Sequence, residues 1–302
     1  MDSPRDAVEL WAVDVSAWNC APYTQIDARG TKPAHAEALE RDVRVLLQHD
    51  TTAIDKVLRY LRGVDRVRSL VARLLPRVML AERGASWDSL RFGEVMGRPF
   101  AAAPASCDFN ITHDGDWVVM ACSRTDTMRV GVDVMEVTLP TFEQSSASFC
   151  ETMGQTMTAR ERAWVLSGAS DNDILSRLLD LWTYKEAYTK NLGQGLGFPF
   201  ASIELAWWAP TGPFLSVSGA AEDAYRFVEV ALPRGACSAS QSKHGSRIAV
   251  AVGPHAWAAP QVKAPLDAHG AAQSGLLRVC TYDELIARAY SCLLYTSDAA
   301  DD

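Results

Sequence analysis

Residues 181–190, LWTYKEAYTK, place one acid and two lysines directly after an apolar run. The apolar residues before them have the i, i+3, i+4, i+7 spacing of a core-facing helix stripe: Leu175, Leu178, Leu179 and Trp182. Glu186 and Lys190 continue this stripe. A buried carboxylate is costly unless it meets a cation, a metal or strong hydrogen-bond donors. The alternative is a helix end that emerges into water, where the two residues form an ordinary i, i+4 ion pair.

A second acid and a histidine lie on strand-like segments earlier in the chain. In MRVGVDVMEV the valines alternate with other residues, so Asp133 faces away from the valine side of a half-buried strand. His113 ends the short segment FNITH. Each has an ordinary alternative, since an acid on an open strand face is usually solvated and a histidine there is often a turn residue. Together with Glu186 and nearby Lys and Arg residues, they could hold a hard divalent ion on a diphosphate.

The composition is that of a folded protein: 302 residues, 48% hydrophobic and 22% charged, with a net charge of −8. The negative balance argues against broad nucleic-acid binding, although a local basic pocket could still hold a small anion. Seven scattered cysteines without a C-x-x-C pair indicate reduced thiols. With no signal peptide and no apolar run of about 18 residues, we expect a cytoplasmic protein that does not bind membranes.

The first half of the chain predicts helices followed by strands. Leu, Val, Arg and Asp recur at helical spacing over 36–83, which predicts two or more amphipathic helices, and Pro76 should kink or end one of them. The segment FNITHDGDWVVMA then predicts strand, turn and strand, and MRVGVDVMEV a further strand.

The second half repeats that order. Thr158 and Glu161 form a possible capping box before a long helix over 173–190, which a run of glycines ends. Further strand-like segments and an irregular region follow, at 227–232, 247–253 and 254–275. Helices followed by strands in both halves favour an α+β fold over a doubly wound parallel sheet.

The final segment, 292–302, resembles the translation of a transposon-end adapter used in sequencing libraries. We therefore expect that it is not native, and we assign no role to it. The alternative is an ordinary polar terminus.

Three segments, FNITHDGDW, GVDVMEV and WTYKEAYTKNLGQGL, resemble in order and separation the signature regions of the large, surfactin-type phosphopantetheinyl transferases. The similarity extends from residues 65–77 to 281–287. It implies an α+β pseudo-dimer in which two similar lobes meet and coenzyme A lies in the cleft between them. The expected lobes are residues 1–127 and 128–291, with the metal-binding and catalytic residues in the second.

Enzymes of this family transfer 4′-phosphopantetheine from coenzyme A to a serine of an apo acyl or peptidyl carrier protein and release 3′,5′-ADP. The resemblance implies the same Mg²⁺-dependent activity, in a monomer, on carriers of fatty-acid, polyketide, nonribosomal-peptide or lysine biosynthesis. It implies Asp133 and Glu186 as magnesium ligands, Glu186 or a metal-bound water as the base, and Lys190 as a second catalytic residue. The residues expected to contact coenzyme A are Arg62, Arg98, Thr112, His113, Lys185 and Lys190.

One departure concerns the strand motif. Bacterial members commonly read G-x-D-x-E, and this chain has Met135 in place of the second acid, like a methionine-bearing eukaryotic subset. A thioether is a poor magnesium ligand, and strand parity turns Glu136 towards the valine face. We therefore expect a water in place of the missing carboxylate, so that the site keeps two protein carboxylates.

Two other functions remain open. The chain could bind coenzyme A and carrier proteins without transferring, although the intact Asp133, Glu186 and Lys190 argue against this. A metal-dependent hydrolase of nucleotide diphosphates could use the same two acids with water as the nucleophile, but no separate water-activating histidine or third acid is evident.

Overall fold

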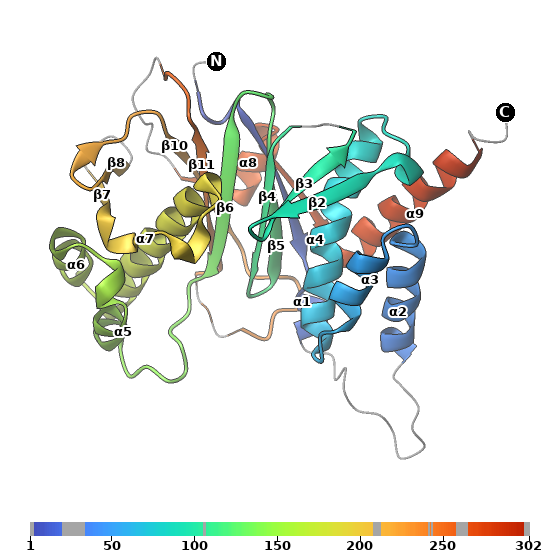
Figure 1. Ribbon diagram of the computed structural model, residues 1–302. Helices are drawn as coiled ribbons and strands as arrows, with labels where there is room; N and C mark the ends of the chain where they lie inside the picture. The colour runs from blue at the N-terminus through green and yellow to red at the C-terminus, as the bar shows by residue number, and fades with distance from the viewer. Residues whose placement is uncertain are drawn as a thin grey trace.

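The chain forms two α+β lobes, which confirms the predicted fold class (Figure 1). The computed structural model describes residues 3–19, 34–104, 107–207, 213–240, 242, 244–257 and 265–298. The first lobe contains a four-stranded sheet in the order β13-β1-β5-β4, formed by β1 (Val8–Asp14), β4 (Phe109–Asp114), β5 (Trp117–Ser123) and β13 (Leu277–Thr281). Its other elements are α1 (Ser16–Asn19), α2 (Ala34–Leu46), α3 (Thr51–Leu58), α4 (Gly63–Glu82), η1 (Trp87–Ser89), α9 (Tyr282–Asp298) and the hairpin of β2 (Arg91–Val95) and β3 (Arg98–Ala103).

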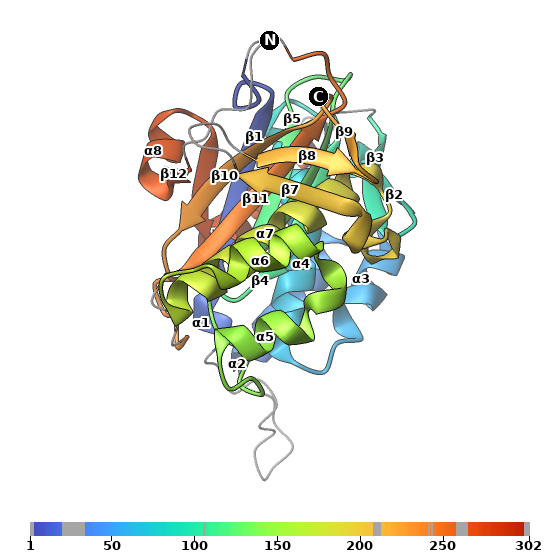
Figure 2. The ribbon, with the colours of Figure 1, turned by 90° about the vertical axis from the view of Figure 1, so that its left-hand side faces the viewer.

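The second lobe is built around one long helix, α7 (Asp171–Leu192), which packs on a sheet in the order β12-β10-β11-β6. The strands are β6 (Arg129–Glu136), β10 (Arg226–Leu232), β11 (Ser246–Gly253) and β12 (Leu266–Asp267). Figure 2 shows α5 (Ser146–Thr152) and α6 (Ala159–Leu166) outside α7. The smaller elements are η2 (Gly154–Thr156), η3 (Gly195–Gly197), η4 (Phe200–Ser202), β7 (Ile203–Trp207), β8 (Pro213–Val217), β9 (Ala220–Ala221) and α8 (Ala268–Gln273).

The end of the described chain returns to the first lobe. Strand β13 pairs in parallel with β1, and α9 packs against α4. The predicted boundary therefore misplaced residues 277–291, because a parallel pairing between distant segments leaves no local sequence signal. Leu293 is 9% exposed and belongs to the first lobe's core, whereas residues 299–302 lie outside the described residues. The non-native origin of 292–302 stays a prediction.

The two sheets meet where β4 runs beside β6 (Figure 1). Three side chains, one just before β4 and two on it, accept hydrogen bonds from backbone N–H groups of β6. The pairs are Asp108 with Val130 at 2.8 Å, Asn110 with Val132 at 2.9 Å and Asp114 with Glu136 at 2.7 Å. The β6 valines pack in a core shared by both sheets, as their alternation predicts. This seam fixes β6, and with it Asp133, relative to the end of β4.

Two local predictions need comment. Pro76 lies inside α4, which continues to Glu82, so it does not end the helix, and the kink stays a prediction. The region 254–275 is not wholly irregular, because β12 and α8 form within it and Asp267 caps α8 through the backbone N–H of Gly270. The capping box of Thr158 and Glu161 is confirmed. None of the described helices has the length and apolar character that crossing a membrane requires.

Candidate functional site

Gly131 lets α7 lie unusually close to β6. A Cβ atom at this position would be 2.1 Å from the carbonyl oxygen of Ala187 and 2.2 Å from the backbone nitrogen of Asn191. The Asn191 side chain also ties the helix to the sheet, since its amide donates to the carbonyls of Arg129 at 2.8 Å and Ala251 at 3.0 Å. The glycine of the G-x-D motif therefore explains how a helix and a strand bring their polar side chains together.

Four of the predicted site residues converge between α7, β6 and β4. The Lys190 ammonium lies 2.5 Å from Asp133 Oδ1, 3.7 Å from Glu186 Oε2 and 3.3 Å from Thr112 Oγ1. The Thr112 hydroxyl donates to Asp133 Oδ1 at 3.0 Å. Asp133 is 4% exposed and Glu186 6%, so both carboxylates lie out of bulk water. The buried-face interpretation of Glu186 is confirmed, and the solvated alternative for Asp133 is wrong.

The electrostatic surroundings of the two carboxylates, Asp133 and Glu186, favour the binding of a cation in addition to Lys190. Burial raises the pKa of Asp133, while Lys190 and the hydroxyl of Thr112 act in the opposite direction. Burial also raises the pKa of Glu186, Lys190 opposes this, and the charge of Asp133 reinforces it. Asp133 Oδ2 is buried and has no hydrogen-bond partner among the described residues. An orphaned carboxylate oxygen beside a second carboxylate suits a hard divalent ion such as Mg²⁺.

The pair supplies only two protein ligands. Within the described part of the chain, no group of three or more His, Cys, Asp or Glu side chains is arranged to hold a metal ion. Met135 packs against the second lobe's core. Glu136 lies near Gly115 and Ser240, on the side away from α7, as strand parity predicts. The water expected in place of a third carboxylate stays a prediction.

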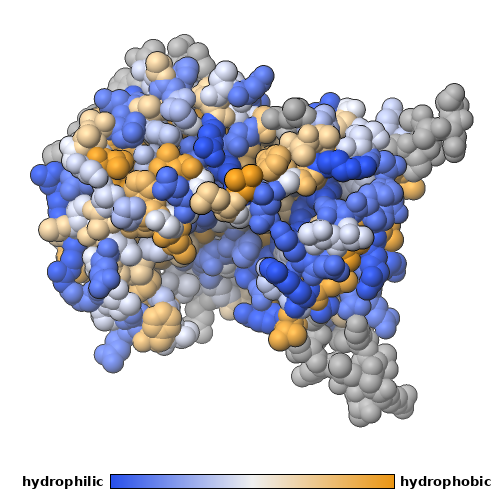
Figure 3. Space-filling model, in the orientation of Figure 1, coloured by the Kyte–Doolittle hydropathy of each residue, from blue (hydrophilic) through white to orange (hydrophobic). Residues whose placement is uncertain are grey.

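His113 opens onto a cavity of about 460 Å³ in the first lobe, between α3, α4 and the β2–β3 hairpin. The cationic residues that line it are Lys56, Arg73 and Arg77, and the acidic ones are Asp50 and Glu94. Figure 3 shows the molecular surface hollowed between the lobes, with many hydrophilic residues around the hollow. His113 is exposed on β4, but neighbouring groups desolvate its ring and lower its pKa, and the charges of Arg68 and Lys190 act in the same direction. The imidazole is therefore neutral at neutral pH and can donate a hydrogen bond to an anion.

The cavity's cations were missed from the sequence. Arg73 and Arg77 lie four residues apart on α4, and Lys56 lies on the preceding helix, α3, so a basic face could have been suspected. Arg77 stacks over Phe92 at 4.5 Å and bonds Asp50 at 2.6 Å, whereas Lys56 pairs only with the half-exposed Glu94, at 2.6 Å, among the contacts described. Lys56 is therefore the cation that a ligand can reach most easily.

The guanidinium of Arg98 donates hydrogen bonds to oxygen atoms of the protein itself. Its guanidinium donates to the carbonyl of Lys190 at 2.5 Å, to that of Val130 at 2.7 Å and to the carboxylate of Asp108 at 2.5 Å. It thus joins the hairpin to the last turn of α7 and to β6. A contact between Arg98 and coenzyme A stays a prediction.

Two predicted coenzyme A contacts lie elsewhere. Lys185 is 1% exposed, and its ammonium bonds the carboxylate of Glu161 at 2.6 Å and two carbonyls on the far side of α7. The predicted contact of Lys185 with coenzyme A was wrong because Lys185 lies about 100° around the helix from Glu186 and so faces another side. Arg62 precedes α4, is 76% exposed at its side chain and approaches only Asp65 in the described contacts, at 3.9 Å. It does not line the cavity.

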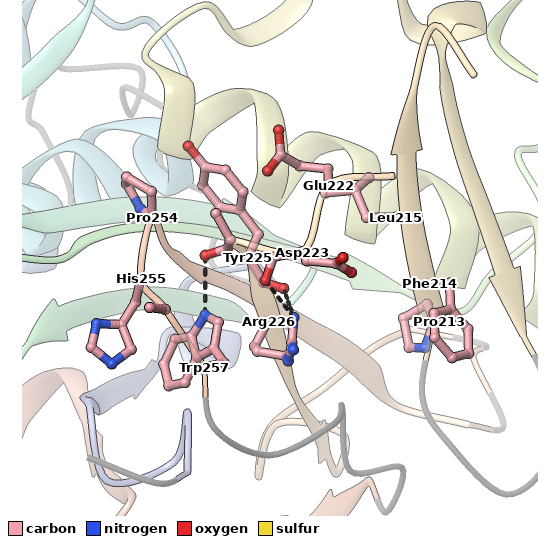
Figure 4. A pocket seen from close by; sticks show the side chains of 12 residues that line it. Pro213, Phe214, Leu215, Glu222, Asp223, Tyr225, Arg226, Pro254, His255 and Trp257 are labelled. Atoms are coloured by element: carbon pink, nitrogen blue, oxygen red, sulfur yellow. Dashed lines mark hydrogen bonds between the residues drawn. The ribbon is translucent and has the colours of Figure 1, made fainter. Parts of the chain in front are cut away.

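A second cavity, of about 880 Å³, lies in the second lobe. Figure 4 shows Tyr225, His255 and Trp257 on one side and Pro213 and Phe214 on the other. None of the predicted site residues lines it. Of the two cavities described here, the first lobe's cavity is the one that a predicted site residue, His113, lines.

Comparison with known proteins gives the class to which this fold and site correspond. A model described as the N-terminal part of 4′-phosphopantetheinyl transferases matches residues 32–125, and a model of the 4′-phosphopantetheinyl transferase superfamily matches residues 129–250. The chain belongs to the 4′-phosphopantetheinyl transferase superfamily.

Individual relatives agree with this assignment. A phosphopantetheinyl transferase of Thraustochytrium sp. is 32% identical over 74% of this chain and 74% of its own length. The 4′-phosphopantetheinyl transferase pptA of Paxillus involutus is 39% identical over 51% of this chain and 63% of its own length. An L-aminoadipate-semialdehyde dehydrogenase-phosphopantetheinyl transferase of Xenopus laevis is 32% identical over 46% of this chain, and the match spans about half of that relative, 48%.

Proposed function

We propose that this chain transfers 4′-phosphopantetheine from coenzyme A to a serine of an apo carrier protein, with Mg²⁺ as the metal. The observation that carries the proposal is the meeting of Asp133 and Glu186, from a strand and a helix, at the ammonium of Lys190. A cavity with three cationic side chains is lined by His113, and the charge of Lys190 acts on the pKa of that histidine. The names of the relatives supply the reaction class.

The residues divide the chemistry between them. The serine oxygen attacks the β-phosphorus of the coenzyme A diphosphate, the bond to 3′,5′-ADP breaks, and the serine proton passes to a carboxylate oxygen of Glu186. A raised pKa suits a general base that must accept a proton near neutral pH. Lys190 can shift its ammonium from Asp133 towards the leaving diphosphate oxygen. A bound Mg²⁺, held by Asp133 and Glu186, would supply charge neutralisation on the diphosphate.

The cavity in the first lobe would take the 3′,5′-ADP part of coenzyme A. Lys56 would pair with a phosphate there in place of Glu94, and the neutral His113 would donate to the diphosphate. Lys56→Gln should therefore raise the KM for coenzyme A by about tenfold, because a charge-assisted hydrogen bond is worth roughly 1.5–3 kcal/mol. The value of kcat should change little.

Steady-state kinetics with coenzyme A as the varied substrate measure this effect. Arg59→Gln is the matched control, since it removes the same charge from the end of the same helix, at an exposed position outside the cavity. Equal KM values for the two variants would place coenzyme A elsewhere.

The transfer itself is tested by mass spectrometry of carrier proteins. Incubation of the chain with coenzyme A, Mg²⁺ and an apo carrier should add one phosphopantetheine arm to the carrier, and EDTA should prevent it. The panel should include acyl carrier, peptidyl carrier and aminoadipate-pathway carrier domains, because one relative's name includes L-aminoadipate-semialdehyde dehydrogenase. Coenzyme A binding without a shift in any carrier would favour a binding protein. Release of nucleotide without a carrier would favour a hydrolase.

A further inference from the structure

Two cysteines of the first lobe lie with their sulfur atoms in contact. Cys107 stands just before β4, Cys122 lies on β5, and their Sγ atoms are 2.8 Å apart. The adjoining backbone is aligned, since the N–H of Ser123 donates to the carbonyl of Asp108 at 2.8 Å. Both cysteines are reduced in the structure. A disulfide requires the sulfurs to approach to about 2.05 Å, which is a small further movement from this distance.

A cation lies beside this sulfur pair. Arg83, which ends α4, places Nη1 3.1 Å from the sulfur of Cys107 and 3.7 Å from that of Cys122. The other nitrogen of the fork, Nη2, bonds Glu9 at 3.0 Å. Glu9 lies opposite Cys122 in the pairing of β1 with β5, and it is 6% exposed. A buried carboxylate therefore holds the guanidinium against the two sulfurs.

The two thiols have different roles in this arrangement. The hydrogen bond with Cys122 and the charge of Arg83 outweigh burial and lower the pKa of Cys107 to about 6. Cys107 is half-buried and can meet small molecules, whereas Cys122 is fully buried. The pKa of Cys122 is raised, first through its hydrogen bond with Cys107 and then by burial. Cys107 is thus a thiolate nucleophile at neutral pH, and Cys122 is its protonated partner.

Other described cysteines lack these features. Burial raises the pKa of Cys150, Cys280 and Cys292. Cys237 is exposed, which makes it a suitable internal comparison for simple accessibility.

We propose that Cys107 and Cys122 form a redox-active dithiol site that low-molecular-weight disulfides, such as oxidised glutathione, convert into an intramolecular disulfide. The Cys107 thiolate attacks one sulfur of glutathione disulfide, forms a mixed disulfide and releases one glutathione thiolate. The Cys122 thiol then loses its proton to solvent and displaces the second glutathione thiolate. Two protein thiols are oxidised, and one small disulfide is reduced to two thiols. The site is separate from the transferase residues, and the proposal does not rest on the proposed function.

Mass spectrometry of the full chain in glutathione buffers tests the proposal. As the share of oxidised glutathione rises, the chain should lose two hydrogens without retaining glutathione, and peptide mapping should join Cys107 to Cys122. Cys122→Ser should instead accumulate one glutathione on Cys107, because the partner that displaces it is gone. Cys107→Ser should show neither product at Cys122. The control Cys237→Ser should behave as the parent chain does.

Two results in the glutathione buffers would overturn the proposal. One is a parent chain whose Cys107 and Cys122 stay alkylatable in buffers that attach glutathione to Cys237. The other is a two-hydrogen loss that persists in Cys107→Ser. A measurement on the parent chain does not depend on whether the variants fold. Iodoacetamide at pH 7 should label Cys107 of the parent at least tenfold faster than Cys237. Labelling of Cys107 at or below the rate of Cys237 contradicts the proposal as well.

Discussion

Glu186→Gln should reduce carrier-protein modification by about 10²–10⁴-fold or more, because a positioned general base contributes that much and the variant also loses a metal ligand. The substitution removes the charge and keeps the shape of a side chain that is 6% exposed. Single-turnover transfer, followed by the mass of the carrier, measures the loss. Glu37→Gln is the matched control, since Glu37 is an exposed acid on α2. Equal rates for the two variants would show that Glu186 is neither base nor ligand.

The same variant should not be less stable than the parent in metal-free buffer. Folding raises the pKa of Glu186, so the folded state binds more protons than the unfolded state above the ordinary glutamate pKa. The parent therefore loses stability relative to the glutamine variant as pH rises through this window. Melting temperatures at pH 5 and pH 8 should show the variant gaining on the parent at the higher pH. A gain at the lower pH would reverse the sign and contradict the assigned burial.

Gly131→Ala should lower the free energy of unfolding by at least about 1–3 kcal/mol and abolish transfer. The added methyl group would lie 2.1 Å from the carbonyl oxygen of Ala187, which belongs to the backbone of α7 and cannot rotate away. The helix must retreat from β6, and this separates Glu186 and Lys190 from Asp133. Urea unfolding and the carrier mass assay measure the two effects.

Gly154→Ala is the matched control for this change. Gly154 lies in the short helix η2 of the same lobe, and a Cβ atom there meets nothing within 4 Å. It should leave stability within about 0.5 kcal/mol of the parent and transfer unchanged. If Gly131→Ala behaves in the same way, the close approach of α7 is not what assembles the site.

The sequence predicted the elements best where one face is buried and the other is not. The valine alternation of β6 gave the side on which Asp133 lies, and the core between the sheets confirms it. It could not predict that 277–298 would return to the first lobe, because β13 pairs with β1 across most of the chain. Contacts of that kind depend on the assembled sheet rather than on local periodicity.

The candidate site shows the same division. Asp133, Glu186 and Lys190 could be grouped from motif resemblance, and the structure brings them together. Periodicity failed for Lys185, because α7 is buried on nearly all sides near its end and an apolar stripe no longer separates one face from another. Lys56 was missed because its cavity depends on how α3, α4 and the β2–β3 hairpin pack together, which local periodicity does not show. The pairing of Cys107 with Cys122 was likewise not predictable, because it depends on which residues become neighbours across β4 and β5.

Strand β6 is an edge strand of its sheet, and exposed edge strands can pair with strands of other protein chains. Here the amides of Val130, Val132 and Glu136 are already occupied by Asp108, Asn110 and Asp114 of the neighbouring lobe. Side chains rather than another backbone thus close this edge. The arrangement gives the protein intrinsic protection against intermolecular β-pairing at the place where its reactive groups must stay accessible.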